Sequence, residues 1–297
     1  MSRTFRHLTV NDTVRDIVCH PAFAHFGKHL LPRSDYVNNT TPIRDIAHLM
    51  PLHRHVQADV VLRALNHMID ICAAGELLFH SYYDDHRRNI TGLFFFRGKP
   101  NAPFAVICPG GGFVYLGTLH EGFPLALEIQ QKGYNVFVLQ YRVGGEHSAC
   151  EDLAMALSWI FQHAETLNIS SQCYSLWGGS AGARMAAIMG TAGTTAFGGK
   201  DIPHPASVIT AYTAYQTCSP YDPPTFAVIG DKDHIVTIDV MKKRIQLLTT
   251  YGIDAAIHLY EQVGHGFGTG EGTPAAGWIN DAVRFWEKHI HFRASNR

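Results

Sequence analysis

From residue 76 onward, short and largely apolar runs alternate with longer amphipathic segments. The apolar runs lie at residues 103–108, 134–141, 173–177, 206–211, 225–229 and 255–260. Short runs of this kind are typical of parallel strands that are buried on both faces. Segments with helical spacing of apolar residues lie at 122–132, 150–167, 183–189, 238–250 and 275–290. Strands separated by helices predict an α/β fold in which helices flank a mostly parallel central sheet.

The region before residue 76 has a different pattern. Apolar residues follow helical spacing over 14–31 and 43–74, and four prolines interrupt this region: Pro21, Pro32, Pro42 and Pro51. The sequence therefore predicts two parts, a helical N-terminal extension at residues 1–75 and a separate domain at residues 76–297.

The start of the second region contains a predicted hairpin. Two antiparallel strands are expected at residues 76–83 and 89–97, joined by a turn at 84–88.

The composition excludes several classes of protein. Apolar residues make up 46% of the chain, charged residues 16%, and the formal net charge is −1, which argues against disorder and gives no basic excess for binding nucleic acid. No apolar run approaches the length of about 18 residues that a membrane span needs. The six cysteines form neither a C-x-x-C pair nor a zinc spacing, and no secretory signal is visible. A cytoplasmic protein without a metal, nucleic-acid or membrane partner is expected.

The sequence Gly178-Gly179-Ser180-Ala181-Gly182 fits the pattern G-x-S-x-G between a predicted strand and a predicted helix. A sharp turn at this place would lift the Ser180 hydroxyl above the end of the sheet. Glycines suit the crowded positions of such a turn because they have no Cβ. The alternative is a glycine-rich turn in which the serine has no chemical role.

A second glycine-rich segment, Pro109 to Phe113 (P-G-G-G-F), follows another apolar run. Consecutive glycines allow backbone N–H groups to approach a substrate oxygen closely. Gly111 and Gly112, together with Ala181, are the predicted donors of an oxyanion hole. A phosphate-binding loop is the rival interpretation, but the segment fits neither G-x-x-x-x-G-K-[ST] nor G-x-G-x-x-G.

Two further loops supply an acid and a base. Asp233 follows the run at 225–229 and is the preferred carboxylate, with Asp231 as the alternative. His265 lies between glycines after the last apolar run and is the predicted general base. The chain order Ser180, Asp233, His265 is that of the α/β-hydrolase catalytic triad. A solvated turn with two acids is the simpler interpretation of residues 231–233.

Together these motifs make the chain similar to the α/β-hydrolase fold serine esterases. It resembles in particular the bacterial esterase and lipase group related to hormone-sensitive lipase and the short-chain acetyl or feruloyl esterases. The resemblance covers residues 76–292 and includes the P-G-G-G-F segment, the nucleophile turn around Ser180 and the G-H-G-F loop around His265. Pro109 replaces the histidine of the H-G-G-G motif, which favours the feruloyl and acetyl esterase branch. Asp233 lies only 53 positions after Ser180 (233 − 180), which leaves no room for a large inserted lid.

The resemblance implies that residues 76–297 are an α/β-hydrolase catalytic domain and makes residues 1–75 a candidate cap. It implies a serine carboxylesterase that hydrolyses short-chain, acetyl-type esters of a small-molecule substrate through an acyl-enzyme, without a metal or an organic cofactor. A peptidase or thioesterase could use the same triad, and a catalytically inactive ligand-binding member of the fold is a third alternative. The sequence is compatible with a homodimer. Phe113, Tyr115 and Trp177 are candidate neighbours of the substrate pocket, and packing in the core explains them equally well.

Overall fold

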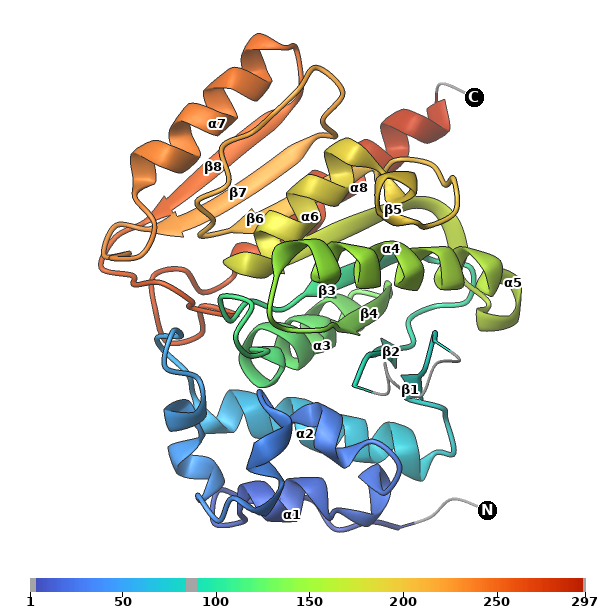
Figure 1. The fold of residues 1–297 in the computed structure, drawn as a ribbon, viewed down its shortest axis with the longest axis vertical. Coiled ribbons are helices and arrows are strands. Elements are labelled where there is room, and N and C mark those ends of the chain that lie inside the picture. The colour runs from blue at the N-terminus through green and yellow to red at the C-terminus, as the bar shows by residue number, and fades with distance from the viewer. Residues whose placement is uncertain (1–3, 84–89, 296–297) are drawn as a thin grey trace.

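The computed structural model describes residues 4–83 and 90–295, and its centre is an eight-stranded sheet (Figure 1). The strand order is β1-β2-β4-β3-β5-β6-β7-β8. β1 and β2 are antiparallel to their neighbours, and all other adjacent strands are parallel. The strand bounds are Phe79–His80 (β1), Gly92–Phe96 (β2), Pro103–Cys108 (β3), Asn135–Gln140 (β4), Ser170–Gly179 (β5), Ser207–Ala211 (β6), Thr225–Gly230 (β7) and Ala255–Tyr260 (β8).

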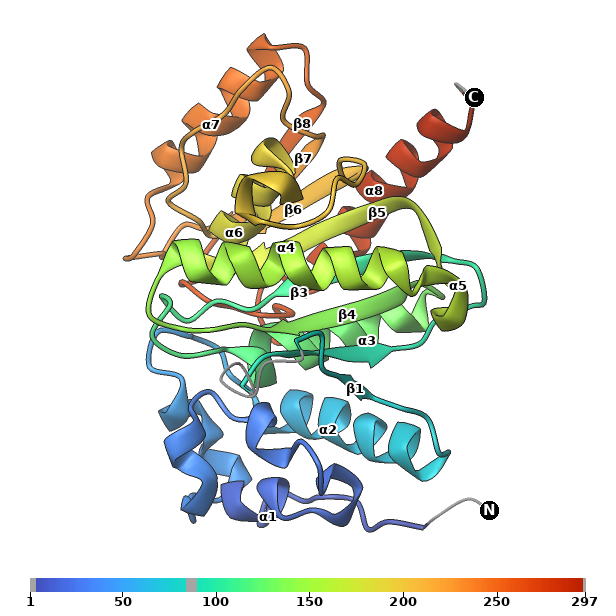
Figure 2. The ribbon, with the colours of Figure 1, turned by 45° about the vertical axis from the view of Figure 1, so that its right-hand side comes forward.

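Helices cover both faces of this sheet (Figure 2). One face packs against α4 (Glu146–Gln162) and α6 (Ala181–Ala192), and the other against α3 (Phe123–Gln131) and α8 (Trp278–Ser295). α7 (Ile238–Thr250) packs on β7 and β8, and the short α5 (Ala164–Leu167) precedes β5. The predicted α/β class with a mostly parallel sheet is therefore confirmed.

The central strands have apolar residues on both faces because both faces are covered. All five residues of β2 and all six of β4 are buried, and so are all six of β7. Parallel strands β3, β5, β7 and β8 end at the same edge of the sheet, so the loops that follow them meet there. These loops carry the four groups of residues that the sequence singles out.

Residues 4–75 form short helices at one side of the sheet, drawn in blue in Figure 1. They include α1 (Val14–Val18), four short 3₁₀ segments, and the longer α2 (Ala58–Ala73), which packs on α3. The 3₁₀ segments are Pro21–Phe23, Gly27–Leu30, Ser34–Asn38 and Ile43–Leu49. Buried residues of α1 and of these segments, such as Ile17 and Leu30, belong to the same apolar cluster as Phe94 from β2 and Phe123 from α3.

The structure corrects several expected boundaries. Residues 14–31 and 43–57 form short helical pieces, as the interrupting prolines predict, because proline restricts the backbone at the breaks. The first hairpin strand is only the two residues Phe79–His80, not 76–83, and the whole of the expected turn at 84–88 lies outside the described residues. The expected helix at 150–167 begins earlier, at Glu146, and a break at His163 separates its last turn.

Within the described ranges 4–83 and 90–295, no helix is both long enough and apolar enough to cross a membrane.

Replacing Phe26 by alanine is expected to destabilise the whole molecule. The Phe26 ring is 8% exposed, and its centroid lies 5.6 Å from that of Phe79 and 5.7 Å from that of Phe94 in the sheet. Removing a buried phenylalanine ring costs about 3–5 kcal/mol. Urea unfolding should show one transition at a lower midpoint, because the extension and the sheet share a core.

The matched control is Tyr221→Ala, which removes a ring that is 80% exposed and should change the unfolding free energy by about 0.5 kcal/mol or less. Two separate transitions, of which Phe26→Ala shifts only one, would show that the extension folds independently.

Candidate active site

Ser180 lies at the junction between β5 and α6, in a strained turn. Its backbone has φ 51° and ψ −117°, a conformation that residues with a side chain rarely adopt. The flanking glycines are required by close packing: a Cβ on Gly178 would lie 2.3 Å from the Gly182 carbonyl carbon, and one on Gly182 would lie 1.9 Å from the Cys108 carbonyl oxygen. The turn therefore presents the hydroxyl at the N-terminus of α6, where backbone N–H groups favour negative charge.

His265 joins the serine to a carboxylate. Its Nε2 lies 3.0 Å from the Ser180 Oγ, and its Nδ1 lies 2.7 Å from Oδ2 of Asp233. The His265 side chain is 5% exposed and that of Asp233 is 1% exposed. An Nδ1–H donated to a buried carboxylate leaves Nε2 unprotonated and able to accept the hydroxyl proton.

The two acids of the 231–233 segment have separate positions. Asp233 also accepts hydrogen bonds at Oδ1 from the N–H groups of Ile235 and Val236, both at 2.8 Å, which fixes the carboxylate. Asp231 instead accepts from the N–H of Gln262 at 2.6 Å and braces the loop after β8. The structure thus brings Asp233 and not Asp231 to the imidazole.

The glycine loop after β3 runs beside the serine. Gly111 has φ 126° and Gly112 has φ 64°, and a Cβ on Gly110 would lie 3.1 Å from the Ser180 Cβ. Within the described part of the chain, the backbone N–H groups of Gly111, Gly112 and Ala181 donate no hydrogen bond to the protein. These are the three predicted oxyanion donors, and all three are available to an external oxygen.

Sequence reasoning missed a group of buried polar residues beneath this loop. Glu121, which is 1% exposed, contacts the side chains of His53 and Tyr212, and His53 contacts Tyr115. The only signal in the sequence is that Glu121, a charged residue, directly precedes the apolar start of the predicted helix at 122–132. Nothing local distinguishes His53 from the other histidines of the extension.

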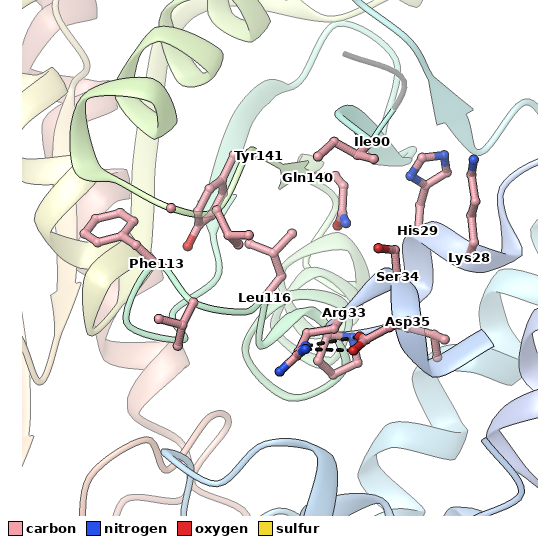
Figure 3. Close-up of a pocket in the computed structure, with 15 residues that line it drawn as sticks. Lys28, His29, Arg33, Ser34, Asp35, Ile90, Phe113, Leu116, Gln140 and Tyr141 are labelled. Atoms are coloured by element: carbon pink, nitrogen blue, oxygen red, sulfur yellow. Dashed lines mark hydrogen bonds and ion pairs between the residues drawn. The ribbon is translucent and has the colours of Figure 1, made fainter. Parts of the chain in front are cut away.

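The candidate pocket residues have different environments. Trp177 is fully buried and packs against Trp278, and Tyr115 is buried with its hydroxyl 2.7 Å from Nδ1 of His53. Phe113 lines a cavity of about 510 Å³ between the glycine loop and the extension (Figure 3). The same cavity is also lined by Val114, two residues after Gly112, and by Gln140, the last residue of β4.

One loop of the extension, residues 52–55, touches the site from the other side. The Arg54 N–H lies 3.1 Å from the carbonyl oxygen of His265 and 3.2 Å from that of Gly266. Leu52 packs over the glycine loop: a Cβ on Gly112 would lie 3.1 Å from its Cδ1. The cap role of residues 1–75 stays a prediction, and these contacts identify the part of the extension that borders the site.

Among the residues that the structure describes, no three His, Cys, Asp or Glu side chains are grouped so that they could hold a metal ion.

Comparisons with known proteins support the fold. Residues 97–205 match the BD-FAE family model. No curated protein sequence matches the chain at a significant level. Among solved structures, the acetyl ester-xyloside bifunctional hydrolase of Caldicellulosiruptor lactoaceticus has a TM-score of 0.61 at 18% identity, over 72% of this chain and 95% of that one.

Two further structures are esterases. The carboxylesterase of Lactobacillus plantarum has a TM-score of 0.58 at 22% identity, over 67% of this chain and 92% of its own. Esterase 2 of Thermogutta terrifontis, in a form phosphonylated by cyclosarin, has a TM-score of 0.55 at 17% identity, over 73% and 93%. The chain is therefore an α/β-hydrolase-fold protein that resembles the esterase and lipase group of this fold.

Proposed function

We propose that the chain is a serine carboxylesterase that hydrolyses short-chain acyl esters. The observation that carries this proposal is the pair of hydrogen-bond distances at His265, 3.0 Å to the Ser180 hydroxyl and 2.7 Å to the Asp233 carboxylate. A hydroxyl, an imidazole and a carboxylate in this order form the minimum apparatus for attack on an acyl carbon.

In the proposed reaction, Nε2 of His265 takes the proton of Ser180, and the Oγ attacks the ester carbonyl. The N–H groups of Gly111, Gly112 and Ala181 stabilise the negative charge that develops on the carbonyl oxygen. When the tetrahedral intermediate collapses, the C–O bond to the alcohol breaks, and His265 returns its proton to the departing oxygen. A water molecule, activated by the same imidazole, then hydrolyses the acyl-enzyme and regenerates Ser180.

Two observations favour a small acyl group. Leu52 packs over Gly112, which restricts the space beside one proposed oxyanion donor. One of the similar structures is an acetyl ester hydrolase, and another, esterase 2 of Thermogutta terrifontis, has propionate bound. Phe113 and Val114, which follow Gly112 in the chain, line a cavity that is proposed to take the alcohol side of the ester (Figure 3).

The test compares initial rates on p-nitrophenyl acetate, p-nitrophenyl octanoate, an acyl thioester and a dipeptide amide. The proposal expects the highest kcat/KM on the acetate, with a fall of at least about tenfold on the octanoate. Faster turnover of the thioester or of the amide would identify the site as that of a thioesterase or a peptidase. Absence of both turnover and fluorophosphonate labelling would indicate an inactive, ligand-binding protein.

A further inference from the structure

A buried carboxylate lies directly behind the nucleophile and the glycine loop. Glu121 is at the end of a π-helical turn, Thr118–Gly122, and its Oε2 accepts a hydrogen bond of 2.7 Å from the N–H of Gly110. A Cβ on Gly110 would lie 2.6 Å from this oxygen, and a Cβ on Gly179, the residue before Ser180, would lie 2.5 Å from it. The carboxylate therefore packs closely between the glycine loop that carries the oxyanion donors and the turn that carries Ser180.

A negative charge at this place works against the proposed chemistry unless it is compensated. The tetrahedral intermediate places a second negative charge at the adjacent donors, and two like charges repel strongly where water is excluded. Burial raises the pKa of Glu121, but the nearby His53 and the hydrogen bonds to the carboxylate lower it more, to about 2. The carboxylate is therefore ionised at neutral pH.

The compensating group comes from the extension. Nε2 of His53 lies 3.1 Å from Oε1 of Glu121, and the two side chains are 2% and 1% exposed. The hydroxyl of Tyr115 lies 2.7 Å from the other ring nitrogen of His53 and accepts the N–H of Leu52 at 3.0 Å, which fixes the ring. Oε1 of Glu121 also accepts the Tyr212 hydroxyl at 2.8 Å.

The same contacts connect the two catalytic loops. The centroid of the Tyr212 ring lies 5.0 Å from that of His265, and its hydroxyl accepts the N–H of Gly268 at 3.3 Å. Next to His53 in the chain, Arg54 donates its N–H to the carbonyl oxygen of His265 at 3.1 Å. Glu121 and His53 therefore lie at the centre of a network that reaches the oxyanion loop, the nucleophile turn and the histidine loop.

We propose that Glu121 and His53 are positioning residues that act as an ion pair: the carboxylate anchors the oxyanion loop behind Ser180, and the ring of His53 offsets its field at the developing oxyanion. The extension then contributes to catalysis itself and does not only cover the site. This inference rests on the proposed esterase function.

The test is a double-mutant cycle on p-nitrophenyl acetate hydrolysis. His53→Gln leaves the carboxylate uncompensated, and kcat should fall by about 100-fold with KM nearly unchanged, because the oxyanion exists only in the transition state. Glu121→Gln keeps the size of the side chain and an acceptor for Gly110, and should lower kcat by about tenfold. The double variant, with both charges removed, should also lose only about tenfold, so that removing the carboxylate rescues His53→Gln.

His20→Gln is the matched control. His20 is also a buried histidine of the extension, 5% exposed, but its Nε2 lies 2.8 Å from the carbonyl oxygen of Arg6, its ring packs on Phe23, and it does not touch Glu121. Its replacement should leave kcat unchanged within about twofold.

A folded double variant with about tenfold loss supports the ion pair, whether or not His53→Gln folds alone. A double variant that does not fold, or whose kcat falls by the product of the single losses, about 1000-fold, overturns it. If the wild type is active but Glu121→Gln does not rescue His53→Gln, only the ion pair is refuted. If the wild type shows neither hydrolysis nor labelling, the esterase function and this inference are refuted together.

Discussion

Replacement of Ser180 by alanine is expected to reduce kcat for p-nitrophenyl acetate by about 10⁵-fold or more, because the attacking oxygen is removed. Residual turnover should come from the oxyanion donors and from substrate binding alone. The fold should persist, since alanine occupies less space and the N–H of residue 180 still donates to the Ala211 carbonyl oxygen, 2.9 Å away. Initial-rate assays on the acetate ester measure the loss of activity. Mass spectrometry after fluorophosphonate treatment measures labelling, which should be lost together with the activity.

Ser171→Ala, at the opposite end of the same strand, is the control and should retain full activity and labelling. Labelling that persists in Ser180→Ala at the wild-type rate would identify a different nucleophile and would refute the proposed mechanism.

Asp233→Asn should lower kcat by about 10⁴-fold with little change in thermal stability. The asparagine can still accept the N–H groups of Ile235 and Val236 through its oxygen, but it presents an amide N–H₂ to Nδ1 of His265. The imidazole then places its proton on Nε2 and cannot accept the proton of Ser180. Steady-state kinetics on the acetate ester measure the loss.

Asp231→Asn is the matched substitution two residues away. It keeps an acceptor for the Gln262 N–H, and kcat should stay within about threefold of the wild type. The reverse outcome, with the large loss at Asp231, would show that the loop rearranges in solution and that Asp231 is the partner of the imidazole.

The core strands could be predicted from the sequence because their pattern is local. Strands buried on both faces have consecutive apolar residues, and the predicted runs at 103–108 and 225–229 agree with β3 and β7 to within one residue. The extension was less predictable. Its apolar residues pack against the sheet in short 3₁₀ turns, and the spacing of 3₁₀ and α-helical turns is too similar to separate in such short pieces.

The candidate site was predictable where a residue type is required by its own turn. Gly178 and Gly182 leave no space for a side chain, and this constraint marks Ser180 in the sequence. The choice between Asp231 and Asp233 was open, because both follow the same strand and only the path of the loop decides which carboxylate faces His265.

The sequence alone determined the class of fold, the order of the main elements and two of the side chains that meet at the edge of the sheet, Ser180 and His265, since each depends on patterns within a few residues. Only the tertiary structure decided that Glu121 is buried behind the oxyanion loop and that His53 of the extension is its partner. These residues are 68 positions apart (121 − 53) and lie on elements without a shared local pattern. Their pairing follows from the packing of the extension against the sheet, and the free energy of that packing is distributed over the whole core.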